Sequence, residues 1–229
     1  MRRTCKTAIA ISVCCATFLF LFFATGCGSS SSNAKIRLIN AAPIGSNVDM
    51  LIDSKNVASN IAYGSASTYA SVSAGSRHLQ LEPTGSNSAF SDQTITLKGG
   101  TDTSIVAASG PSSGEFSLTD NNTAPSSGNV SLRVINASPF LGTCDVYIVT
   151  AGTSINAQTP TFTNVANASA SGYSTVAAGT YQVFFTLPGS KTIVVSTASL
   201  SFTSGQIRTI MALDGQSGGV TTSVLSDLN

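Results

Sequence analysis

The 229-residue sequence has no tryptophan, one histidine (His78) and few charges, since Asp, Glu, Lys and Arg make up 9% of it against about 25% in ordinary globular domains. A single histidine without a cysteine cluster excludes a zinc site of recognisable spacing. No Gly-x-Ser-x-Gly sequence follows a strand and opens a helix, as a serine hydrolase would require. The ten carboxylates are scattered singly, unlike a glycosidase pair. The sequence predicts a non-enzyme with no cofactor and no metal.

Cysteine is also scarce in the part that folds. Of five cysteines, three lie within the first fifteen residues and a fourth is Cys27, which leaves only Cys144. No intramolecular disulfide can form there. Cys144 alternates with Val146 and Ile148, which predicts a buried, unreactive thiol.

The N-terminal residues are typical of an export signal. Arg2, Arg3 and Lys6 precede an uncharged apolar run from Ala8 to Ala24, and the chain continues to Cys27 as Thr-Gly-Cys. This end resembles a bacterial lipoprotein signal, which implies removal of residues 1–26 and acylation of Cys27. Several acyl chains give stable anchoring, whereas one does not. The alternative is an uncleaved signal anchor.

Residues 27–34 contain a serine run without large apolar side chains and are expected to form a flexible tether. No aspartate follows Cys27, and the lipoprotein resemblance then implies sorting to the outer membrane of a Gram-negative cell. Removal of the signal leaves eight basic against ten acidic residues, so we expect a membrane-anchored envelope protein without affinity for nucleic acid.

The rest of the chain is a tandem repeat. Ile36–Pro43 and Leu132–Pro139 share five of eight residues at an offset of 96, and residues 60–79 and 164–183 share nine of twenty at an offset of 104. The second copy therefore carries eight extra residues within Val149–Phe162, which read as a longer surface loop. At the end of each copy, Phe116–Asp120 resembles Ser223–Asp227.

The period within a copy is two residues, as in a half-buried strand. Val48, Met50 and Ile52 alternate with Asp49, Leu51 and Asp53. Each copy has about seven short strands separated by turn residues. We predict an all-β protein with two tandem immunoglobulin-like antiparallel sandwiches, at residues 35–120 and 129–229, joined by a polar linker at 121–128.

Both copies contain Arg-Leu/Val-Ile-Asn-Ala-Ala/Ser-Pro, followed by Asn-Ile/Val-Ala and Tyr-x2-Val-x2-Gly. This ordered set resembles the family catalogued as domain of unknown function 4397. The resemblance implies exported or surface-anchored bacterial proteins, often with tandem copies and without an established activity. One departure is Asn167, which stands where the first copy has Tyr63, so an aromatic contact is expected to be missing there.

Two charged positions recur in both copies. Arg37 and Asp49, like Arg133 and Asp145, are predicted to form an ion pair across neighbouring strands, worth roughly 0.2–1 kcal/mol if exposed. The alternative is a shared ligand or metal site.

Other recurring residues have a structural interpretation. Asn40 and Asn136 precede a turn-making proline and are expected to bond the local backbone. Gly75 and Gly179 are expected to have a positive φ. His78 alternates with buried leucines and is predicted to be solvated.

Two functional classes remain. The first is a non-catalytic surface display, adhesion or protein-binding module. The second is a carbohydrate-binding module, in which Tyr63, Tyr69, Tyr147 and Tyr173 would supply stacking faces. The segment Val149–Phe162 is either a binding loop or a plain insertion.

Overall fold

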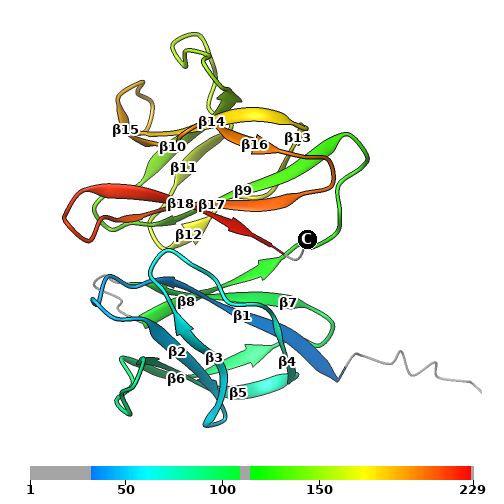
Figure 1. The fold of residues 1–229 in the computed structure, drawn as a ribbon, viewed down its shortest axis with the longest axis vertical. Helices are drawn as coiled ribbons and strands as arrows, with labels where there is room; N and C mark the ends of the chain where they lie inside the picture. Colours follow the sequence, from blue (N-terminus) through cyan, green and yellow to red (C-terminus); the bar gives the residue numbers. More distant parts are fainter. Residues whose placement is uncertain (1–31, 109–113, 228–229) are drawn as a thin grey trace, which may run out of the picture.

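The computed structural model describes residues 32–108 and 114–227, which form two β-sandwiches, one above the other in Figure 1. Strands are the only regular elements among these residues, and none of this part of the chain forms a helix long and apolar enough to cross a membrane. The signal sequence and Cys27 lie outside the described residues. The all-β tandem sandwich is confirmed.

The first repeat has an inner sheet, which faces the second repeat, and an outer sheet. The inner sheet 1 has the order β4-β1-β7-β8 and the outer sheet 1 the order β3-β2-β5-β6. The strands are β1 (Asn33–Ala41), β2 (Val48–Ile52), β3 (Lys55–Ile61), β4 (Ala70–Ser73), β5 (Gly75–Pro83), β6 (Ser91–Leu97), β7 (Asp102–Ala108) and β8 (Gly114–Asp120).

The second repeat has the same arrangement of two sheets, but some of its strands are divided into shorter ones. Its inner sheet 2 has the order β12-β9-β17-β18, with β13 also on β9, and its outer sheet 2 the order β11-β10-β14-β15, with β16 also on β14. The strands are β9 (Asn129–Ala137), β10 (Cys144–Thr150), β11 (Phe162–Val165), β12 (Ser169–Ala170), β13 (Ser174–Ala177), β14 (Gly179–Thr186), β15 (Ile193–Ser196), β16 (Leu200–Phe202), β17 (Ile207–Asp214) and β18 (Val220–Ser226).

Strand number and direction differ in part from the prediction of about seven antiparallel strands per copy. The repeats have eight and ten described strands, and β1 runs parallel to β7, as β9 does to β17. The parallel pairs arise because β6 and β16 belong to the outer sheets. The chain crosses over after them and enters the inner sheet in the direction of its first strand.

The alternation predicted for the outer sheets is confirmed. Val48, Met50 and Ile52 of β2 point into the first core, where they meet Leu79 and Leu81 of β5. The second core is built in the same way around β10 and β14. Each sandwich therefore buries a hydrophobic layer of its own.

The first strand of each inner sheet is buried on both faces. In β1, Ile36 and Leu38 belong to the first core, whereas Ile39 and Ala41 belong to a third hydrophobic cluster. That cluster joins the repeats, because Ile135 of β9 and Met211 of β17 are also members. The two inner sheets thus face each other, and the molecule is a stack of four sheets (Figure 1).

Only one of the two glycine predictions is confirmed. Gly75 has φ +104°, but Gly179 is not among the glycines with positive φ. The hydrogen bonds of the residue two positions on also differ between the copies. The Arg77 guanidinium donates to the carbonyls of both Ser73 and Ala74, whereas the corresponding Tyr181 hydroxyl donates only to Ala177.

Candidate functional site

A buried arginine of the first repeat binds the end of the second. Arg37 of β1 is 1% exposed, and its Nη2 lies 2.6 Å from Asp227 Oδ1, just after β18. Its Nε donates to Ser104 Oγ at 2.7 Å and its Nη1 to the Ser226 carbonyl at 3.1 Å. The guanidinium is therefore held on three sides.

The buried arginine of the second repeat binds the end of the first repeat in the same way. Arg133 Nη2 lies 2.5 Å from Asp120 Oδ1 at the end of β8, and Nε donates to Thr209 Oγ1 at 3.0 Å. Asp120 Oδ2 also accepts the hydroxyls of Ser104 and Tyr69, each at 2.7 Å. Each arginine thus pairs with the acid at, or directly after, the end of the other repeat's last strand.

The predicted pairing of Arg37 with Asp49, and of Arg133 with Asp145, is therefore wrong. The aspartates lie on the outer sheets, and the arginines lie on inner-sheet faces that point toward the other repeat. Asp49 and Asp145 instead each accept a backbone N–H in their own repeat, at distances of 2.6 and 2.8 Å. The donors are asparagines with positive φ, so these carboxylates stabilise local turns.

Tyrosines cover the guanidinium groups. The Arg37 guanidinium lies 4.8 Å from the Tyr69 ring centre, and that of Arg133 lies 5.0 Å from the ring centre of Tyr173, in cation–π geometry. Burial raises the pKa of Tyr173 to about 12 and also raises that of Tyr69. Burial lowers the pKa of Arg37, but the Asp227 and Asp120 carboxylates and Tyr69 raise it to a net value above normal.

Tyr63 also reaches across the repeats, because its hydroxyl donates to the Asp214 carbonyl. Burial raises the pKa of Tyr63 to about 12. Asn167 stands at the corresponding position of the second repeat and carries no ring. Three of the four tyrosines considered for sugar stacking therefore lie against the other repeat or against buried arginines.

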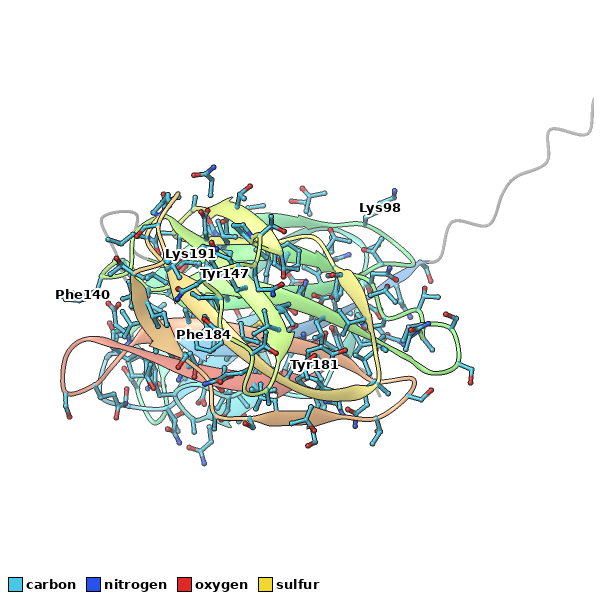
Figure 2. All side chains as sticks on the ribbon, turned by 90° about the horizontal axis from the view of Figure 1, so that it is seen from above. Lys98, Phe140, Tyr147, Tyr181, Phe184 and Lys191 are labelled. Atoms are coloured by element: carbon cyan, nitrogen blue, oxygen red, sulfur yellow. The ribbon has the colours of Figure 1, made fainter. Side chains whose placement is uncertain are left out.

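The fourth, Tyr147, is 2% exposed, so it does not offer the stacking face to a sugar that the sequence predicted. It lies on the outer face of β10, beneath the β10–β11 loop, and packs with Val149, Ile155 and Phe184. Lys191 covers its remaining side, with Nζ 4.2 Å from the ring centre and 3.1 Å from the hydroxyl (Figure 2).

This packing explains the eight extra residues of the second copy. The outer face has Tyr147, Val149 and Phe184 where the first repeat has Leu51, Asp53 and Gln80. A face with three large apolar side chains needs a cover. The loop supplies it through one buried residue, Ile155, which is 4% exposed. The insertion is therefore anchored to its own sheet.

The remaining candidates have structural roles. Cys144 is fully buried, and burial raises its thiol pKa to about 12. Asn40 and Asn136 bond nearby backbone groups, as predicted. His78 has a side chain 42% exposed, and its Nε2 lies 2.5 Å from Asp92 Oδ1. That hydrogen bond, the largest influence, lowers the pKa of Asp92.

A cleft lies at one end of the inner sheets and is shared by both repeats. Its volume is about 410 Å³, and we call it the end cleft. Its lining comes from the β1–β2 loop, the β9–β10 loop and the β17–β18 turn: Pro43, Gly45, Phe140, Asp214, Gly215, Gln216, Gly218 and Gly219. Sequence analysis missed it, because three segments far apart in the chain build it.

Phe140 is the most exposed large apolar side chain described, at 73%, and Figure 2 shows it projecting from the periphery. Its loop is nevertheless fixed. Asp214 Oδ1 accepts from Ser138 Oγ at 2.5 Å and from the Phe140 N–H at 3.3 Å, and Ser138 Oγ accepts the Leu141 N–H at 3.0 Å. A rigid loop therefore presents a bare aromatic ring to solvent.

The turn on the other side of the end cleft requires glycine. A Cβ on Gly215 would lie 2.5 Å from the Gly218 carbonyl oxygen, and Gly218 has φ +95°. Tight glycine turns leave backbone groups accessible to a ligand. Within residues 32–108 and 114–227, no group of three or more His, Cys, Asp or Glu side chains could hold a metal ion.

Residues 34–147 match the family described as a domain of unknown function, DUF4397. Through these residues the chain belongs to the DUF4397 family. The DUF4397 match begins in β1 and runs through the linker into β10 of the second repeat. No curated protein matches the chain.

Several solved structures share a low similarity with this DUF4397 chain. The TIE protein of Bacillus anthracis is 12% identical with a TM-score of 0.26, and the match covers 85% of this chain and 34% of that one. The chain thus spans about a third of that protein.

Two further matches are carbohydrate-related by description. The family 26 carbohydrate-binding module of Eubacterium rectale Amy13K, in complex with maltoheptaose, is 12% identical with a TM-score of 0.26, over 84% of this chain and 95% of that one. A streptococcal virulence factor described as binding alpha-glucan is 9% identical with a TM-score of 0.24, over 83% and 97%.

Proposed function

We propose that this chain is a non-catalytic module of the bacterial cell envelope, anchored through lipid on Cys27, that binds a protein partner at the end cleft. The observation that carries the proposal is Phe140, an aromatic side chain 73% exposed on a fixed loop beside a cleft built by both repeats. Exposed aromatic anchors beside a cleft are typical of binding surfaces.

The direction of β1 supports this arrangement. The strand begins at Asn33, six residues after Cys27, and its far end leads to Pro43 in the end cleft. Six residues reach at most about 20 Å, so the sandwich would stand close to the bilayer. A nine-residue strand is about 30 Å long. The end cleft would therefore point away from the membrane, where a partner has access.

A rigid pair of repeats is suited to presenting a binding surface to a partner. Two buried arginine pairs and a shared hydrophobic cluster join the repeats, so a partner bound at loops from both would find them already positioned. A preorganised surface loses less conformational entropy on binding. A glycan is the alternative ligand. The chain's residues favour it less, because the four tyrosines that could stack on a sugar are occupied in other contacts.

Photo-crosslinking in native membranes tests the proposed surface. A photoreactive phenylalanine analogue at Phe140 is compared with the same analogue at Lys98, which is exposed at the opposite end of the molecule (Figure 2). We expect a defined protein adduct from position 140 only, and the purified adduct partner should bind the wild type but not Phe140→Ser. Equal adducts from both positions, or none, would contradict the proposal.

Two further measurements separate the alternatives. A glycan array that retains the wild type but not Phe140→Ser would favour the carbohydrate-binding class instead. Metabolic palmitate labelling tests the anchor: we expect Cys27→Ser to lose both label and membrane association. A labelled Cys27→Ser protein would contradict lipidation at this residue.

A further inference from the structure

The two faces that join the repeats are equivalent in sequence as well as in space. Arg37 corresponds to Arg133 and Asp120 to Asp227, and each arginine pairs with the acid of the opposite repeat. The hydroxyls that support the arginines correspond too. Ser104 and Thr209 lie on β7 and β17, the strands parallel to β1 and β9.

The apolar layer between the repeats has the same symmetry. Each inner sheet contributes corresponding members to the cluster, namely Ile39 and Ile135, Val106 and Met211, and Leu118 and Leu225. An interface in which each side carries the same groups, and each group contacts the complement on the other side, is isologous in the sense of a twofold dimer. One such face is therefore complementary to a copy of itself.

The linker is the segment that joins the two faces covalently within one chain. It contains no strand, most of its residues are exposed, and its hydrogen bonds to the sandwiches come from its two ends. At the last residue, the Gly128 N–H donates to Ser204 Oγ and the Gly128 carbonyl accepts the Ala178 N–H, both within the second repeat. The Asn121 N–H lies 3.4 Å from the Tyr173 hydroxyl, and Asn122 Nδ2 donates to Asp102 Oδ2 at 2.7 Å. Of these two contacts, the one from Asn121 reaches the second repeat and the one from Asn122 stays with the first, so little depends on which chain supplies the second repeat.

We propose that the inter-repeat face also accepts the second repeat of another copy of this chain, so that two chains exchange repeats and form a twofold dimer. In that dimer Arg37 of one chain pairs with Asp227 of the other, and Arg133 pairs with Asp120 likewise between chains. All buried contacts between repeats are kept, and only the path of the linker changes. This is reciprocal domain swapping.

The protein concentration then determines whether the closed monomer or the exchanged dimer is populated. A short flexible linker gives the intramolecular contact an effective concentration of the order of millimolar. The closed monomer is therefore favoured in micromolar solution. Crowding of anchored chains at a membrane would raise the share of exchanged dimer, a consequence that rests on the lipid anchor proposed above. The exchange itself depends neither on the anchor nor on the end cleft.

Shortening the linker removes the closed monomer. Asp120 binds Arg133, which lies four strand residues, about 13 Å, beyond Asn129. A variant lacking residues 122–127 has three peptide units between Asp120 and Asn129, with a reach of about 11 Å. The matched control replaces residues 122–127 with a Gly-Ser sequence of equal length.

Light scattering during gel filtration gives the readout. We expect the shortened protein to be a dimer at micromolar concentration with near-UV circular dichroism like that of the wild type, while the control is a monomer. Adding Asp120→Lys to the shortened protein should abolish the dimer, because it places a positive charge against Arg133 of the other chain. A folded, monomeric shortened protein would overturn the proposal.

A second measurement decides the matter if the shortened protein does not fold. A protease site is inserted between Pro125 and Ser126 of the full chain, both in the linker, and the cut protein is mixed with a ¹⁵N-labelled cut preparation. Native mass spectrometry should show complexes of mixed mass, since each first repeat accepts the second repeat of another molecule. Complexes that never mix, or halves that separate, would overturn the proposal.

Discussion

Replacing Asp227 with asparagine removes the charge that Arg37 faces while preserving the shape of the side chain. Both side chains are almost fully shielded from solvent, at 1% and 0% exposure. Breaking a buried pair by removing one partner typically costs 3–5 kcal/mol, because the remaining charge has no compensation. Arg37 retains its bonds to Ser104 and to the Ser226 carbonyl, so we expect the low end of this range.

The expected loss for Asp227→Asn is therefore about 3 kcal/mol in the free energy of unfolding, or roughly 6–12 °C in melting temperature for a chain of this length. Asp49→Asn is the matched control. The Asp49 carboxylate accepts the Asn60 N–H and the Thr84 hydroxyl at 2.6 Å, and an amide oxygen can accept both bonds. We expect this control to change stability by less than about 1 kcal/mol.

Equilibrium urea unfolding measures both variants, and a double mutant completes the test. Arg37→Met combined with Asp227→Leu should recover most of the loss, because a packed apolar pair often replaces a buried ion pair without penalty. If Asp227→Asn loses no more stability than Asp49→Asn, the account of the buried pair is refuted.

Three other predictions concern titration, packing and reactivity. The pKa of Tyr63 and Tyr173 is about 12 in the folded protein, above the ordinary value near 10, so stability should be intact below about pH 10 and fall as pH rises toward 12. A flat unfolding free energy between pH 9 and 12 would count against their burial. Ile155→Ala should cost about 2 kcal/mol by urea unfolding, against less than about 0.5 kcal/mol for the exposed Ile44→Ala, and equal losses would contradict the covering role of the loop. Cys144 should resist iodoacetamide at pH 8 in the native protein and react in denaturant, because its thiol is buried with a pKa of about 12. Rapid native labelling would contradict this placement.

The repeat and the strand period were enough to predict the sandwiches. Val48, Met50 and Ile52 alternate because one face of the outer sheet meets the core, and period two records such a face directly. The eight-residue insertion was also placed between the correct strands from the change in offset alone.

The ion pairs could not be found from proximity in the sequence. Arg37 and Asp227 are 190 residues apart, and the arginine's partner belongs to the other repeat. One signal was present, because Phe116–Asp120 resembles Ser223–Asp227 and gives each repeat an acid at the same place. A period-two pattern carries no information about which of two like faces supplies the partner of a charged residue.

The covering loop had a signal that periodicity analysis did not use. Tyr147 and Val149 alternate correctly with the core residues of β10, yet they are large and apolar on what should be a solvated face. An apolar outer face predicts a cover rather than a platform. The end cleft had no comparable signal, since the loops that build it meet only in the folded chain.

The two repeats form one rigid body, joined by the Arg37–Asp227 and Arg133–Asp120 pairs between them. Backbone ¹⁵N relaxation measures the rotational correlation time of each repeat in the same sample. The account predicts one common value for the strands of both repeats, as for a single particle of the full mass. Two shorter values, each that of a single sandwich on a flexible linker, would contradict it.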